Sequence, residues 1–67
     1  MSVYKVVELV GSSSDSFEDA ARSAVEKAGS SLRDMRIAEV GALDMKVEEG
    51  KVVAFRARVK VSFKYED

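Results

Sequence analysis

The sequence predicts an α+β domain of order β-α-β-β, in which a three-stranded antiparallel-type sheet packs on one helix. Three observations support this. The first segment is rich in valine, the second has apolar residues at helical spacing, and the last alternates strictly between apolar and polar residues. With 67 residues, we treat 1–67 as a single domain.

The first strand is expected over residues 3–10 (VYKVVELV), a run of the β-branched and aromatic residues that strands favour. Gly11 ends it, and a run of serines follows. Because serine is a strong N-cap residue, we predict that Ser13 caps the following helix.

The helix is predicted to end at Gly29, a residue type that commonly follows a helix C-terminus. Its length of about fifteen residues corresponds to roughly 22 Å. Glu18 and Arg22 are spaced for an i,i+4 ion pair. The apolar face is formed by Phe17, Ala20, Ala21, Ala24, Val25 and Ala28.

A second strand is predicted over residues 35–47, with a bulge or bend at Gly41. A hairpin turn follows at residues 48–51, with Gly50 at a position of positive φ. The hairpin places the last strand next to the second.

The last strand, residues 53–65, has an apolar or aromatic side chain at every odd position. Thirteen residues span roughly 43 Å, longer than the helix. We expect this strand to lie at the centre of the sheet and to extend beyond the helix, either at residues 59–65 or at its other end. A second copy of the chain would cover the uncovered part, so that Val61→Asp would separate the copies.

The composition excludes several classes of site. The chain has no cysteine and no histidine, so disulfides, thiolate sites and typical zinc or copper sites are excluded, and a bound metal would be a hard cation on oxygen ligands. The net charge of −1 gives no general attraction to nucleic acid or membranes. No transmembrane span or signal-peptide pattern is present, and we expect a cytoplasmic protein.

No set of residues typical of catalysis is recognisable, because the chain lacks a histidine, a cysteine nucleophile and a phosphate-binding glycine loop. We therefore expect no enzyme. A chain this small is marginally stable alone and usually depends on disulfides, a metal or a partner. We expect self-association.

Three groups of charged residues have alternative interpretations. The basic row Arg56, Arg58, Lys60 and Lys64 is a solvated sheet face, a pocket for an anionic ligand, or a nucleic-acid surface; the balanced charge disfavours the last. Glu39 lies in an apolar strand and is expected to pair with Arg56 or Arg58, or to serve a ligand site. The acids 15, 18 and 19 either complement the helix dipole or bind a cation.

The sequence resembles the dodecins, small β-α-β-β proteins that assemble as hollow twelve-subunit shells and in many cases bind flavin. The resemblance spans the chain. It rests on residues 4–13 (YKVVELVGSS), the helix alanines, residues 38–40 (AEV) and residues 59–63 (VKVSF). It implies a homo-oligomer, a dodecamer, that takes up a small molecule or ion.

The residues that hold flavin in dodecins differ here. Where flavin-binding members have a stacking tryptophan this chain has Ile37, and where they have a glutamine it has Arg56. Isoleucine has no aromatic face, and arginine has no acceptor. The residues 36–38, 44–45 and 55–56 look instead like the calcium dodecin branch.

We therefore expect a non-enzymatic binding or storage protein, with calcium rather than flavin as the implied ligand. The alternatives are a flavin-binding dodecin with an altered site and a purely structural oligomer without a ligand. The candidate ligand-binding residues are Ile37, Glu39, Arg56 and Arg58. The resemblance assigns no metal ligands.

Overall fold

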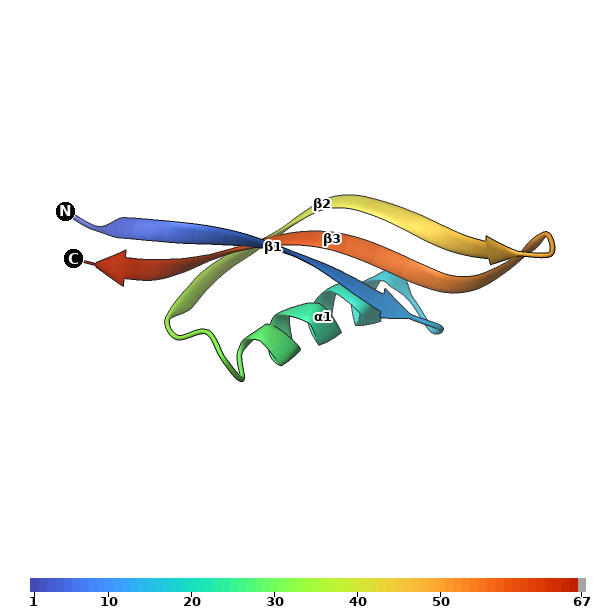
Figure 1. The fold of residues 1–67 in the computed structure, drawn as a ribbon, viewed down its shortest axis with the longest axis horizontal. Coiled ribbons are helices and arrows are strands. Elements are labelled where there is room, and N and C mark those ends of the chain that lie inside the picture. Colours follow the sequence, from blue (N-terminus) through green and yellow to red (C-terminus); the bar gives the residue numbers. More distant parts are fainter. Residues whose placement is uncertain (67) are drawn as a thin grey trace.

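The computed structural model describes residues 1–66 and has the predicted β-α-β-β order. The elements are β1 (Val3–Ser13), α1 (Phe17–Ala28), β2 (Met35–Glu48) and β3 (Lys51–Glu66). The three strands form one antiparallel sheet of order β1-β3-β2, and α1 packs on one face of it (Figure 1). Within the described part, no helix is long and apolar enough to cross a membrane.

The prediction that the last strand is central is confirmed, since β3 pairs with β1 on one side and with β2 on the other. The hairpin turn closes at the pair Glu48–Lys51, and Glu49 and Gly50 have φ of 52° and 75°. The register of β2 shifts between Val40 and Ala42, which confirms the expected bulge at Gly41.

The core lies beneath the helix, at the middle of β3. Ala20 of α1 and Ala57, Val59 and Val61 of β3 are almost completely buried. Farther out on the same face the β3 side chains are half-buried, and Tyr65 near the end is exposed. The alternation predicted for β3 is therefore confirmed, and burial is greatest under the helix.

Of the two ends expected to be uncovered, the hairpin end of β3 does extend beyond the helix (Figure 1), whereas the placement at residues 59–65 was wrong for Val59 and Val61, as was the expected effect of Val61→Asp. Val59 and Val61 are 0% and 1% exposed because α1 of the same chain covers them. The sheet instead extends past the helix at both ends, in a molecule whose principal extents are 51 × 19 × 13 Å. Val61→Asp would consequently bury a carboxylate inside the protomer and unfold it, rather than separate two copies.

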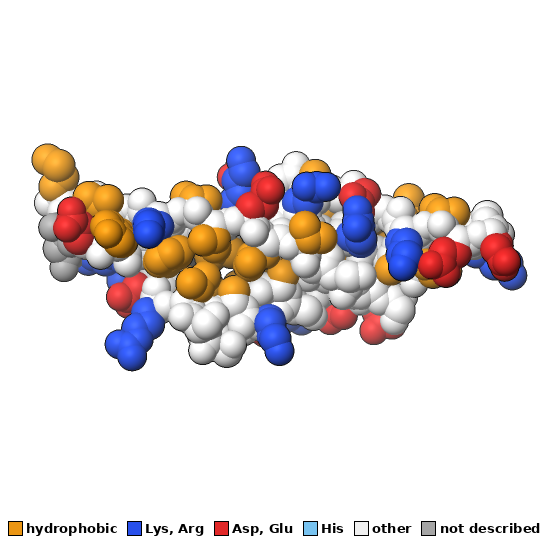
Figure 2. Space-filling model, viewed as in Figure 1, with side chains coloured by type: hydrophobic (Ala, Val, Ile, Leu, Met, Phe, Trp, Pro, Cys, Tyr) orange, Lys and Arg blue, Asp and Glu red, His pale blue; other side chains and the backbone are white. Residues whose placement is uncertain are grey.

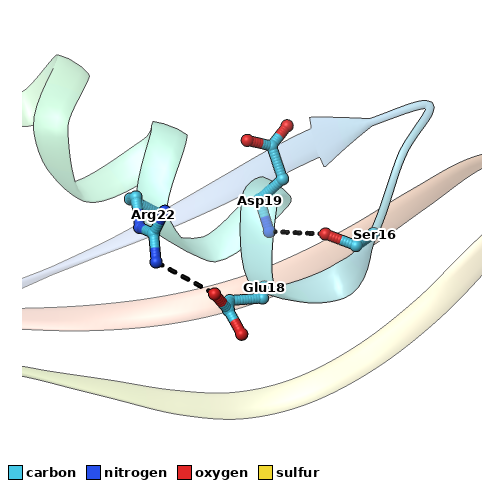
Figure 3. A network of polar contacts seen from close by, with 4 residues as sticks. All are labelled: Ser16, Glu18, Asp19 and Arg22. Carbon is cyan, nitrogen blue, oxygen red and sulfur yellow. Dashed lines mark hydrogen bonds and ion pairs between the residues drawn. The ribbon is translucent and has the colours of Figure 1, made fainter.

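The predicted helix cap was also wrong. Ser16, not Ser13, is the N-cap, and its Oγ accepts a hydrogen bond of 2.9 Å from the backbone N–H of Asp19 (Figure 3). Ser13 ends β1 and donates its hydroxyl proton to Asp19 Oδ2 at 2.7 Å, so it organises the connection to the helix. The helix is thus shorter than expected, at 12 residues, and Gly29 is its C-cap as predicted.

The distance between helix and sheet depends on Gly11 of β1. A Cβ atom at this position would overlap the carbonyl oxygen of Ala20 and lie 2.9 Å from the Cβ of Ala24. At Gly41, by contrast, the nearest atom to an added Cβ is the Arg58 carbonyl oxygen at 4.0 Å. Helix docking therefore requires glycine at position 11.

Gly11→Ala is expected to lower the free energy of unfolding by about 3 kcal/mol, because the helix must move away from the sheet. Gly41→Ala, the matched control, is expected to change it by less than about 1 kcal/mol. Urea denaturation at one fixed protein concentration measures both. Equal losses in the two variants would contradict this account of helix packing.

Candidate functional site

The sheet face away from α1, called here the helix-free face, carries most of the polar residues of the strands. On β3 the side chains of Arg56, Arg58, Lys60 and Ser62 alternate with the buried positions. The register places on the same face Val6, Glu8, Val10 and Ser12 of β1 and Ile37, Glu39, Ala42 and Asp44 of β2. All four predicted ligand-binding residues, Ile37, Glu39, Arg56 and Arg58, thus share one face.

Ile37 is the centre of two adjoining shallow hollows on this face. One, of about 300 Å³, is lined by Val6, Ile37, Glu39, Lys60 and Ser62. The other, of about 470 Å³, is lined by Tyr4, Arg36, Ile37 and Ser62. Ile37 is 65% exposed, so its side chain is available to a ligand or a neighbouring chain.

Glu39 does not have the partner expected from the sequence. Arg56 and Arg58 pair with β2 farther along the hairpin, and the residue opposite Glu39 is Lys60. On its other side Lys60 is opposite Glu8 of β1. A lysine therefore lies between two carboxylates across the middle of the sheet, an arrangement of opposite charges that favours strand pairing.

Arg56 instead forms a bidentate ion pair with Asp44. Its Nε donates to Oδ1 at 2.6 Å and its Nη2 donates to Oδ2 at 2.9 Å, with both side chains about two-fifths exposed. The hydrogen bond from Arg56 lowers the pKa of Asp44 against a smaller opposing effect of desolvation, and the positive charges of Arg56 and Arg58 lower it further. The same hydrogen bond raises the pKa of Arg56.

The sequence analysis did not identify Asp44 as a partner of Arg56, and counting along the hairpin does not find this pair. Regular pairing continued from Glu48–Lys51 would place Asp44 opposite Phe55, and the register shift between Lys46 and Val47 brings it opposite Arg56 instead. Arg58 has no such acid opposite it, since its cross-strand neighbours are Val10 and Ala42.

The acids at the start of α1 are used within the fold. Glu18 accepts a hydrogen bond of 2.9 Å from Arg22, as predicted from their spacing, and the backbone N–H of Asp19 donates to Ser16 (Figure 3). The Asp19 carboxylate accepts a hydrogen bond from Ser13. Within residues 1–66, no group of three or more histidine, cysteine, aspartate or glutamate side chains is arranged to hold a metal ion.

Comparison with known proteins establishes the family. The family model for dodecin matches residues 3–66. The chain belongs to the dodecin family. Its sequence is 44% identical to the calcium dodecin of Mycobacterium tuberculosis over 64 residues, which are 96% of this chain and 90% of that protein.

Solved dodecin structures have the same fold. A mutant dodecin from Thermus thermophilus superposes with a TM-score of 0.90 at 33% identity, covering 100% of both chains. The crystal structure of the M. tuberculosis calcium dodecin, described as a calcium-chelating antigen with a novel calcium-binding site, superposes with a TM-score of 0.85 at 44% identity, covering 97% of this chain and 93% of that one. The overhanging sheet is thus part of the shared dodecin fold.

The Arg56–Asp44 pair is expected to make the stability of the fold fall as the pH is lowered into the acid range. Because the folded-state pKa of Asp44 is lowered, the stabilisation is present above the unfolded-state pKa of about 3.9 and is lost as the pH falls through the lowered folded value. Asp44→Asn is therefore expected to be less stable than the parent chain near pH 7, with the difference disappearing toward pH 2.

Denaturation midpoints measured at several pH values between 7 and 2 test this expectation. Glu48→Gln is the control, because the single contact between Glu48 and Lys46 spans 3.4 Å. Glu48→Gln should change the pH dependence of the denaturation midpoint less than Asp44→Asn does. A stability difference for Asp44→Asn that is the same at every pH would refute the assignment.

Proposed function

We propose that this dodecin is a non-enzymatic, self-assembling protein that binds a divalent cation, with calcium as the first candidate. The observation that carries the proposal is the 44% identity to the M. tuberculosis calcium dodecin over 96% of the chain. The proposed assembly is a homo-oligomer of dodecin type, a dodecamer, and the proposed location is the cytoplasm.

The donor chemistry of the chain fits a hard cation. It contains twelve acidic residues and neither histidine nor cysteine, and calcium is bound through carboxylate, carbonyl and water oxygens. Six to eight oxygen ligands are usual for calcium. Since the described residues of one protomer hold no ready-made acidic cluster, the proposal takes its ligands from more than one copy or from backbone carbonyls as well.

The helix-free face is the proposed location of the ligand. Glu39 contributes a carboxylate to the hollow around Ile37, and the nearby Lys60 limits the local negative charge. Arg58 lies farther along the same face, and Arg56 is held by Asp44. The apolar Ile37 and the charged Glu39 together fit a hollow that is closed by a neighbouring copy, with an ion held at its polar side.

Calcium is expected to raise the melting temperature of the assembled protein and to be retained stoichiometrically in equilibrium dialysis. A ligand at one hundred times its dissociation constant stabilises the state that binds it by about 2.7 kcal/mol. Magnesium and a chelator serve as controls. If no calcium is retained, the proposal fails. Saturable quenching of riboflavin fluorescence would instead support the flavin-binding alternative.

Glu39→Gln is expected to weaken calcium retention by about tenfold or more, because it removes a charged oxygen ligand. Glu18→Gln is the matched control, since Glu18 is on the helix and paired with Arg22. Isothermal titration calorimetry with calcium measures the affinity of both variants. Unchanged affinity in Glu39→Gln, with the assembly intact, would place the ion elsewhere.

A further inference from the structure

An apolar groove runs between α1 and β2 on the helix side of the sheet. The helix lies over β1 and β3 and barely reaches β2, so the inner face of β2 is left open. The groove has a volume of about 510 Å³ and ionic side chains of α1 at its rim: Glu18, Arg22 and Glu26. Its apolar lining consists of Phe17, Ala21, Val25, Ala38, Val40, Leu43 and Val59.

A second uncovered apolar surface lies on the hairpin arm, defined here as residues 45–53. β1 ends at Ser13, opposite Phe55, so beyond this point the arm is a ribbon of β2 and β3 without a helix (Figure 1). Its four large apolar side chains are between 42% and 57% exposed: Met45, Val47, Val52 and Val53. The groove and the arm are continuous, because Leu43 of the groove is two residues from Met45.

The solvent-accessible area of the protomer is larger than that of a compact monomer of the same mass. The chain of 7.3 kDa exposes 5007 Å². A compact monomer of this mass would expose about 4,200 Å². The excess of roughly 800 Å² equals the share that one partner contributes to a standard interface. Figure 2 shows hydrophobic side chains exposed along the length of the visible face.

The hairpin arm fits the groove better than the arm at the chain termini does. Near the termini, the helix side of the sheet carries the charged Lys5, opposite Phe63, and its Nζ lies 4.8 Å from the centroid of the Tyr65 ring, which is itself 59% exposed. The hairpin arm has uncovered apolar side chains and ends in residues of both charge signs, Lys46, Glu48, Glu49 and Lys51. The groove rim also carries both signs, so close approach brings opposite charges within reach.

We propose that the hairpin arm of a second copy of this chain lies in the groove between α1 and β2. A single contact of this kind covers both the open inner face of β2 and the exposed apolar side chains of the hairpin arm. It uses the helix side of the sheet and leaves the helix-free face available for a ligand. The inference rests on the self-assembly in the proposed function and specifies the surface that carries it.

Disulfide cross-linking tests this contact, because the chain has no cysteine of its own. Chains carrying Val40→Cys in the groove and tagged chains carrying Val47→Cys in the arm are assembled together and oxidised. The matched control replaces Val40→Cys by Val10→Cys, a similarly exposed valine on the helix-free face. We expect at least about fivefold more mixed dimer than in the control, since disulfides form only at short Cβ separation.

A second variant measures assembly directly. Val40 is 49% exposed in the protomer, so Val40→Glu should keep the fold, checked by circular dichroism, while lowering the mass in light scattering. No mixed dimer above the control level in an assembled wild type would overturn the contact and leave calcium binding standing. A monomeric wild type would overturn both the contact and the proposed assembly, and the groove would then belong to a different partner.

Discussion

The structure depends on a mismatch of length between one short helix and a long sheet. Twelve helical residues extend about 18 Å, whereas the molecule is 51 Å long. The helix buries Ala57, Val59 and Val61 at the middle of β3, and this is possible because Gly11 lets Ala20 approach the sheet. Beyond this contact the side chains on the helix side are at most half-buried, and those of the hairpin arm are exposed.

Under the proposed self-assembly, this mismatch makes the stability of the protomer depend on association. The fully buried core is small, and side chains such as Leu43 and Val47 stay half-exposed. Burial of apolar surface is the main favourable term in folding, so a chain with a small core gains most from a partner that covers the rest. An assembly of this kind becomes more stable as the protein concentration rises.

The two faces of the sheet have different physical roles. The helix side carries apolar side chains from the core along the hairpin arm, up to the charged tip at residues 48–51, and suits contact between protein surfaces. The helix-free face carries Glu39 and Lys60 at the hollow around Ile37, Glu8 opposite Lys60, and the Arg56–Asp44 pair farther along the sheet toward the hairpin. Charged groups there remain accessible, so that face can bind an ion or small molecule without disturbing the core. Because successive side chains of a strand point to opposite faces of the sheet, the same strands carry both roles on different residues.

The sequence by itself determined the element order, the central position of β3, the bulge at Gly41 and the positive φ of Gly50. These features follow from local periodicity and from glycine geometry, which act over a few residues. The dodecin resemblance was likewise readable from the sequence, because it rests on the order of short motifs along the whole chain.

Only the tertiary structure decided which residues meet. It placed the cap at Ser16, since Ser13 is taken up by the end of β1, and it placed Val59 and Val61 beneath the helix. It paired Arg56 with Asp44 rather than Glu39, because bulges set the register of β2 against β3. Register and helix position depend on packing between distant segments, and periodicity along one strand carries no information about either.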